Sequence, residues 1–237
     1  MNRRGFLINN SKLALGVSLI PATGFSIYDN ARFTKFISKR PPKDKRTFKS
    51  EAVEEIISEV KKFIFNPELA WMFENCYPNT LDTTVDYEVI DGKPDSFVIT
   101  GDIDAMWLRD STAQVWPYMP LINKDPKIKN LILGLINRQV KCVLTDPYAN
   151  AFFKDLTRIS KWSTDIPKPK PGVHERKWEI DSLCYFIRLS YHYYKISGDK
   201  SFMDSDWDKA ARLVVGTFRA EQRENGTSPY SFSREHS

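Results

Sequence analysis

The sequence has few of the residues that metal sites and disulfide frameworks need. Its 237 residues include three cysteines and three histidines. The cysteines are odd in number and lack metal-ligand spacing, and the histidines are scattered. We therefore expect no metal, no other cofactor and no disulfide. Cys142 and Cys184 fall on the apolar faces of expected helices, so we expect both to be buried free thiols.

Long apolar runs and basic stripes are also missing. The most apolar stretch near the N-terminus, residues 13–20, is too short to span a bilayer, so we expect no stable membrane anchor. The net charge of +5 comes from 35 basic and 30 acidic residues, and much of the excess lies in the first fifty residues. Because no basic stripe carries interleaved aromatic residues, we expect no nucleic-acid partner. No local motif indicates a serine or cysteine nucleophile.

The first fifty residues differ from the rest of the chain. Asn2 to Leu7 reads NRRGFL, which resembles the twin-arginine export motif. Residues 1–30 are therefore predicted to be an export signal, with a disordered basic tail as the alternative. Residues 31–49 are predicted to be a basic linker, and residues 50–237 a single domain. A removed signal of this kind would place the protein in the bacterial periplasm or outside the cell.

Helical periodicity dominates the sequence after residue 50. Apolar residues recur at helical spacing in five stretches: 51–65, 104–118, 127–143, 178–196 and 205–224. Short strands or a hairpin are expected near 87–100, and residues 145–178 form a long connection. The pattern predicts an all-α fold, and its alternation of apolar and mixed-face helices suits a toroid.

Acidic and aromatic residues gather between Phe97 and Pro120. They are Asp102, Asp104, Trp107, Arg109, Asp110 and Trp116. One interpretation is a polar, aromatic-walled pocket, because aromatic rings stack on sugar faces while carboxylates and arginine bind hydroxyl groups. The other is an ordinary helix start with aspartates near the cap and a surface ion pair. The residues alone leave these two readings evenly balanced.

A second charged segment precedes the helix expected at 178–196. It contains His174, Glu175 and Arg176, and Asp181 follows in the first helical turn. A carboxylate at this place favourably meets the helix dipole, so capping is the simpler interpretation for Asp181.

Three motifs resemble a known family. The segments GDIDAMWLRDSTAQVWPY, DPYANAF and HERKWEIDSLCY are similar to signatures of glycoside hydrolase family 125, the exo-acting alpha-1,6-mannosidases. The resemblance extends from Asn66 to the C-terminus. It implies that Asp181 is the general acid that protonates the departing glycosidic oxygen. It also implies a mannose-containing glycan as substrate, bound around these residues: Asp102, Asp104, Trp107, Arg109, Asp110, His174, Glu175 and Arg176. Trp116 is expected in the core and His192 in a structural role.

The resemblance also implies an inverting mechanism on an (α/α)6 toroid. In the family the general base is a glutamate from the C-terminal half of the domain, and no residue here matches it. We therefore expect a monomeric, incomplete toroid, about the N-terminal half, with little hydrolytic activity. Two alternatives remain: a helical carbohydrate-binding protein without turnover, and a polysaccharide lyase in which His174 and Arg176 act on a uronate.

Overall fold

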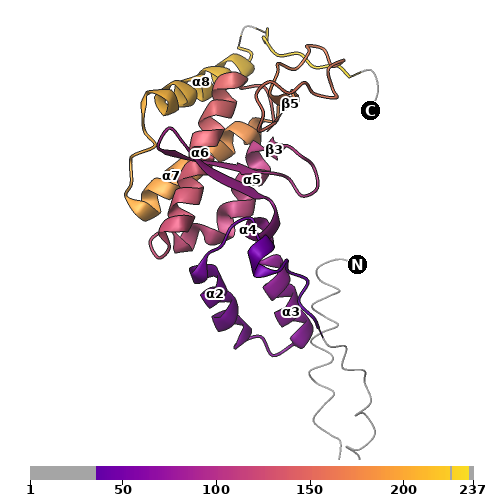
Figure 1. The fold of residues 1–237 in the computed structure, drawn as a ribbon. Helices are drawn as coiled ribbons and strands as arrows, with labels where there is room; N and C mark the ends of the chain where they lie inside the picture. The colour runs from indigo at the N-terminus through magenta and orange to yellow at the C-terminus, as the bar shows by residue number, and fades with distance from the viewer. Residues whose placement is uncertain (1–35, 225, 235–237) are drawn as a thin grey trace, which may run out of the picture. The chain divides into compact units, whose positions relative to one another are not determined.

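The computed structural model describes residues 36–224 and 226–234. The chain divides into two units, residues 1–36 and 37–237, and the second is described here (Figure 1). The export signal expected at 1–30 lies outside the described residues, as does the first part of the linker expected at 31–49. Its later part contacts the domain: Arg40 binds Glu54 and Asp82 at 2.6 and 2.7 Å. No helix in the described part is both long enough and apolar enough to cross a membrane.

Three helices form the first part of the second unit. Helix α2 (Glu51–Lys61) begins at Ser50, whose hydroxyl accepts from the Val53 amide as expected for an N-cap. Helices α3 (Pro67–Cys76) and α4 (Asn79–Thr83) occupy a stretch without helical periodicity. Asn66 caps α3 through two amide contacts, and proline at the first helical position favours the turn.

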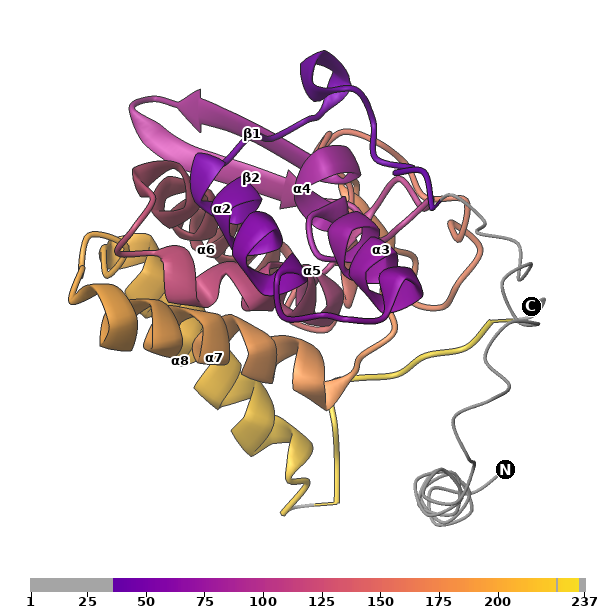
Figure 2. The same cartoon turned by 90° about the horizontal axis from the view of Figure 1, so that it is seen from below.

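A β-hairpin lies against the longest helix. Strands β1 (Val85–Ile90) and β2 (Lys93–Val98) pair antiparallel, and the turn places Asp91 and Gly92 at positive φ. The hairpin expected near 87–100 is therefore confirmed. Strand β2 packs on helix α6 (Pro126–Thr145), where Gly134 permits close approach: a Cβ there would lie 2.5 Å from the Ser96 hydroxyl (Figure 2).

The helix expected at 104–118 begins later than its sequence pattern indicates. Strand β3 (Met106–Trp107) pairs with β4 (Ala151–Phe152), which pairs with β5 (Val173–Glu175). Helix α5 (Leu108–Val115) follows directly and continues as the 3-10 helix η2 (Trp116–Leu121). The all-α prediction is thus wrong in part. Residues 106 and 107, which helical periodicity had placed in a helix, pair instead with a strand of the 145–178 connection.

Helices α7 (Ile180–Ser197) and α8 (Ser205–Glu221) complete the unit. Gly198 ends α7 at φ 67° in the left-handed region, and the Asp204 side chain caps α8. Both helices pack on α6, so that α6 lies at the centre of the hydrophobic core. Trp116 is half-buried at the edge of this core, between the Arg188 guanidinium at 4.0 Å and the His192 ring at 4.9 Å.

The connection at 145–178 is ordered by the C-terminal segment. Ile166 and Ser233 exchange main-chain hydrogen bonds at 2.9 and 2.8 Å. The Arg234 guanidinium binds the buried Asp165 carboxylate through two nitrogens, at 2.7 and 2.6 Å, and lies 3.8 Å from the Trp162 ring centre. Residues 230–234 therefore help to hold residues 145–178 in place.

The cysteines follow the sequence prediction only in part. All three are free thiols, and Cys142 on α6 is buried, whereas Cys184 on α7 is exposed together with Cys76. The expectation of a buried Cys184 is wrong, because the face of α7 that carries it does not pack against α6 in the described part of the chain.

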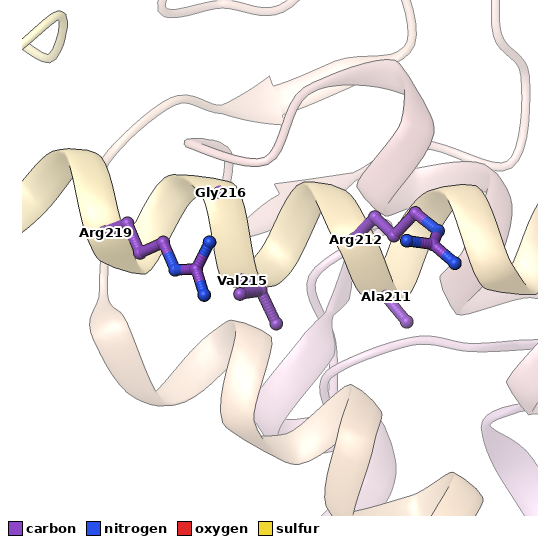
Figure 3. A pocket seen from close by; sticks show the side chains of 5 residues that line it. All are labelled: Ala211, Arg212, Val215, Gly216 and Arg219. Atoms are coloured by element: carbon purple, nitrogen blue, oxygen red, sulfur yellow. The ribbon is translucent and has the colours of Figure 1, made fainter.

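A shallow hollow lies on helix α8. Ala211, Arg212, Val215, Gly216 and Arg219 line it, and Figure 3 shows the Ala211 and Val215 side chains on one side of the helix. The hollow has a volume of about 440 Å³, and none of the residues lining it is acidic. It therefore lacks the carboxylates that glycoside chemistry requires.

Candidate active site

The two charged segments of the sequence meet where α5 and α7 begin. Helix α5 packs against α7, and Arg109 stands in the first turn of α5. Its Nη1 donates to Asp181 Oδ2 at 2.9 Å and to Glu179 Oε2 at 3.2 Å. Asp181 lies in the first turn of α7, and Glu179 is the residue before that helix. The fold thus joins residues separated by seventy or more positions into one cluster.

This acid cluster, defined as Arg109, Asp110, Glu179 and Asp181, holds three carboxylates around one guanidinium. Asp110 contributes the third, at 3.6 Å from Arg109 Nε. The hydrogen bond that Arg109 donates to Asp181 raises the pKa of Arg109 above its ordinary value, and the charges of Glu179 and Asp110 add to the effect. The cluster therefore carries an excess of negative charge in a site where Arg109 and Asp181 are 38% and 42% exposed.

Two members of this cluster and one sequence neighbour have a buried polar atom without a hydrogen-bond partner. These atoms are Asp110 Oδ2, Asp181 Oδ1 and the Ser182 hydroxyl. Natural proteins pair most buried polar groups, so each exception needs an explanation. A ligand rich in hydroxyl groups is one, because every hydroxyl both donates and accepts.

Aromatic residues pack behind the acid cluster. The Trp107 ring lies 5.2 Å from the His174 ring, which meets Phe153 at 5.0 Å. Strands β3 and β5 carry Trp107 and His174 and are joined through β4 (Figure 1). Burial lowers the pKa of His174, so its imidazole is neutral at pH 7, and its buried Nδ1 has no partner. Trp107 and His174 thus come together as one aromatic wall.

Glu175 and Arg176 are bound mainly to other parts of the protein. Glu175 accepts from the Asn150 amide at 3.0 Å and binds Arg234 at 2.9 Å. Arg176 donates to the buried Asp146 at 2.8 Å, yet its Nη1 has no partner. These contacts give both residues a structural role. Of the two, only Arg176 has a buried N–H donor without a hydrogen-bond partner.

Asp102 and Asp104 do not belong to the acid cluster. Both are exposed, and Asp104 forms an ion pair with Arg158 from the long connection. Neither residue contacts Arg109 or Asp181 through a hydrogen bond or ion pair within the described residues. The structure therefore brings Arg109, Asp110 and Asp181 together, and Trp107 with His174, but not these two aspartates.

Sequence reasoning missed five residues with buried, unpartnered polar atoms: Thr100, Gln114, Gln139, Trp178 and Ser182. Trp178 is the clearest, since its Nε1 is unpaired and its ring packs at 5.9 Å on Tyr148 and 5.8 Å on Tyr230. Its position between Lys177 and Glu179 is the one available sequence signal. Nothing in the sequence marks Thr100, Gln114 or Ser182, because polar residues at such positions are ordinary in helices and loops.

Residues 36–224 and 226–234 hold no group of three or more histidine, cysteine, aspartate or glutamate side chains arranged for a metal ion. Arg109 orients the carboxylates of the acid cluster, and this arrangement suits proton transfer by a positioned carboxylate.

Comparison with known proteins gives a consistent result. The family model described as metal-independent alpha-mannosidase (GH125) matches residues 66–237. The chain is 40% identical over 185 residues to the Meiotically up-regulated gene 157 protein of Schizosaccharomyces pombe; the match covers 75% of this chain and 36% of that protein.

A solved structure agrees with the sequence match. It comes from Streptococcus pneumoniae, from work on metal-independent alpha mannosidases, in a non-productive substrate complex with alpha-1,6-mannobiose. The TM-score is 0.72 at 39% identity, covering 80% of this chain and 44% of that one. The chain thus spans less than half the length of either relative. It belongs to the GH125 family of metal-independent alpha-mannosidases.

Proposed function

We propose that this chain carries the acid half of an inverting, exo-acting alpha-1,6-mannosidase site that takes terminal mannose from glycans. One observation supports this most: Arg109 joins Asp181 to the aspartate-rich segment at 2.9 Å, in a family of alpha-mannosidases. Asp181 is the general acid, and Arg109 and Asp110 bind the hydroxyl groups of the terminal mannose. Trp107 and His174 form the wall against which the sugar packs.

Asp181 must be protonated before it can donate to the leaving oxygen. In the structure its Oδ2 faces Arg109, and the start of helix α7 also favours negative charge at this position. We infer that a bound sugar draws Arg109 toward its hydroxyl groups and weakens the ion pair.

An inverting reaction also needs a second carboxylate as the general base. An inverting pair leaves about 6.5–9.5 Å between its carboxyl groups, so that a water fits on the opposite face of the sugar. Asp181 Oδ2 and Glu179 Oε2 bind the same Arg109 nitrogen at 2.9 and 3.2 Å and therefore lie closer together than that. We propose that Glu179 is not the base, and that this 237-residue chain alone binds alpha-mannosides with little or no turnover.

Binding of alpha-1,6-mannobiose tests the proposal directly. Calorimetric titration of the 237-residue chain should show binding that Arg109→Met and Asp110→Ala each weaken by about tenfold, the cost of one lost charged hydrogen bond. Lys209→Met, which removes a cation from an exposed pair on α8, is the matched control and should bind like the wild type. No binding by the wild type would overturn the proposal.

Azide separates a general acid from a mere binding carboxylate. Azide can attack the anomeric carbon from the open face while Asp181 gives its proton to the departing oxygen. We expect azide to promote cleavage of a phenyl alpha-mannoside with formation of the inverted mannosyl azide, and Asp181→Asn to abolish it. Mannoside binding without azide-promoted cleavage would favour the non-catalytic carbohydrate-binding alternative.

The fold and the location of the protein are also proposals. The likeness to the Streptococcus pneumoniae structure supports an arrangement of helical hairpins related to an (α/α)6 toroid. Twin-arginine export rests on Arg3 and Arg4 alone. Replacing both arginines by lysine should hold an exported reporter fused after residue 30 in the cytoplasm, and continued export of the doubly substituted fusion would contradict this assignment.

A further inference from the structure

A polar hollow beside the β1–β2 hairpin is lined by residues that the acid cluster does not use. Its volume is about 470 Å³, which lies within the usual range for small-molecule sites. The hairpin and helix α4 border it (Figure 2). The polar side chains of its lining are Thr47, Thr83, Thr84, Asp86, Asp104 and Lys154.

Three threonine hydroxyl groups in this hollow are prepared to accept hydrogen bonds. Each donates its proton to a main-chain carbonyl oxygen: Thr47 to Leu81 at 2.8 Å, Thr83 to Asn79 at 2.7 Å and Thr84 to Thr80 at 2.9 Å. A hydroxyl has one proton and two lone pairs, so its remaining capacity is that of an acceptor. Their arrangement suits a ligand with many hydroxyl donors.

Each charged side chain that lines the hollow is paired with a charge of opposite sign. Lys154 binds Asp86 at 2.7 Å and Glu88 at 3.1 Å, and Asp104 is paired with Arg158. A site for a small ion offers an unpaired charge, whereas side chains that are already paired can still bind neutral hydroxyl groups. The half-buried Tyr87 ring, packed edge-on against Phe48 at 5.9 Å, adds an aromatic surface of the kind on which sugars stack.

Asp104 links this hollow to the proposed mannose site. The same side chain lines a second hollow of about 430 Å³ together with Arg158, Ser160 and His174. His174 contacts Trp107, two residues before Arg109 of the acid cluster. Asp104 therefore stands between the threonine-lined hollow and the aromatic wall behind the acid cluster.

We propose that the threonine-lined hollow is a distal subsite for a neutral sugar residue of the glycan, beyond the terminal mannose and its neighbour. Asp104 belongs to this path rather than to the terminal-mannose pocket, which explains its ion pair with Arg158. The inference rests on the proposed function, because the glycan that reaches the hollow is the one bound at the acid cluster. It makes an oligosaccharide, and not a disaccharide, the preferred ligand.

Titration with alpha-1,6-linked mannose oligosaccharides of two to five units tests the subsite. We expect one of the longer chains to bind the wild type about three- to tenfold more tightly than the disaccharide, the gain from one or two hydrogen bonds. Thr83→Val and Tyr87→Ala should remove that gain and leave disaccharide affinity unchanged. Thr145→Val is the matched control, since Thr145 makes the same hydroxyl-to-carbonyl bond on α6 outside the hollow.

The outcomes distinguish this inference from the function on which it rests. Equal affinity for all chain lengths, with disaccharide binding intact, overturns the distal subsite and leaves the mannosidase site standing. A length-dependent gain that survives in both Thr83→Val and Tyr87→Ala likewise overturns it. Failure of every oligosaccharide to bind overturns both.

Discussion

Two clusters of charge in this protein differ in how completely their members are paired. On the face between β2 and α6, Asp95 binds Arg138 at 2.5 Å and Lys141 at 2.6 Å, and its side chain is only 2% exposed. At the start of α7, Asp181 binds Arg109 at 2.9 Å but is 42% exposed. One carboxylate has both oxygens paired, whereas the other has a buried oxygen without a partner.

The difference separates structural from functional charge. A buried carboxylate that is fully paired makes its partners hard to remove, because loss of either one leaves an uncompensated buried charge. A half-exposed cluster with unpartnered atoms contributes little to folding but keeps binding capacity for a ligand. Whether the polar atoms of a charged group are all hydrogen-bonded, and not the mere presence of the group, therefore indicates its role.

The largest expected contrast is the reactivity of the thiol beside each cluster. Burial raises the pKa of Cys142, next to Arg138, to about 12. Desolvation and the Asp181 charge also raise the pKa of Cys184, one turn after Asp181, but Cys184 is exposed whereas Cys142 is buried. Alkylation of the folded protein at pH 8, followed by peptide mass spectrometry, should modify Cys184 faster than Cys142 by more than an order of magnitude. Equal rates would mean that the two environments do not differ as described.

Removing the buried carboxylate should cost the most stability. Asp95→Ala leaves the buried Arg138 charge with only Glu88, 4.0 Å away, and we expect the free energy of unfolding in urea to fall by about 3 kcal/mol. Asp206→Ala is the control, because its pair with Lys209 is exposed and contributes less than about 0.5 kcal/mol. A loss below about 1 kcal/mol for Asp95→Ala would remove the distinction between the clusters.

A third charged cluster, Arg40 with Glu54, should have an effect of intermediate size on the pH dependence of stability. The hydrogen bond from Arg40 lowers the pKa of Glu54 below its ordinary value, so Glu54 stabilises the folded state above its unfolded pKa. That contribution is lost as pH falls from about 5 through the folded pKa. Urea unfolding between pH 6 and 3 should show a shallower loss for Glu54→Gln than for the wild type.

Glu59→Gln provides the comparison for that titration. It lies on the same helix in an exposed pair with Lys62, so its pH dependence should match that of the wild type. Identical slopes for Glu54→Gln and the wild type would show that the Arg40 pair contributes nothing measurable.

The smallest expected effect on stability is at Asp181, the proposed general acid. Asp181→Asn removes a half-exposed charge from a cluster with excess negative charge, so the free energy of unfolding should change by less than about 0.5 kcal/mol. Urea unfolding measures this alongside Asp95→Ala. A loss comparable to that of Asp95→Ala would make Asp181 a structural residue and contradict its assignment as a functional one.

Local pattern predicted the helices with strong apolar periodicity. The stripes of α6, α7 and α8 gave their existence and approximate bounds, since burial of one face stabilises each of them. Helix α3 lacks a buried residue and depends on its Asn66 cap and Pro67, so periodicity could not find it. Periodicity also missed strand β3, because its two residues form a strand only by pairing with β4, some 45 positions later.

The candidate site shows the same division. Local composition indicated that residues 97–120 and 174–181 carry unusual charge and aromatic content, and the family motifs gave their chemistry. It could not show that Asp104 faces Arg158 while Arg109 faces Asp181, because these partners come from distant segments. It also could not find Gln114 or Trp178, whose unpaired atoms exist only after burial.

The sequence by itself determined the helical stripes, the two segments rich in charge and their likeness to the alpha-mannosidases, because each is a local or contiguous property of the chain. Only the tertiary structure decided which carboxylates are neutralised, which thiol is buried and which polar atoms stay unpaired. The physical reason is that burial and pairing depend on long-range contacts, and the same aspartate is structural or functional according to what the fold places against it.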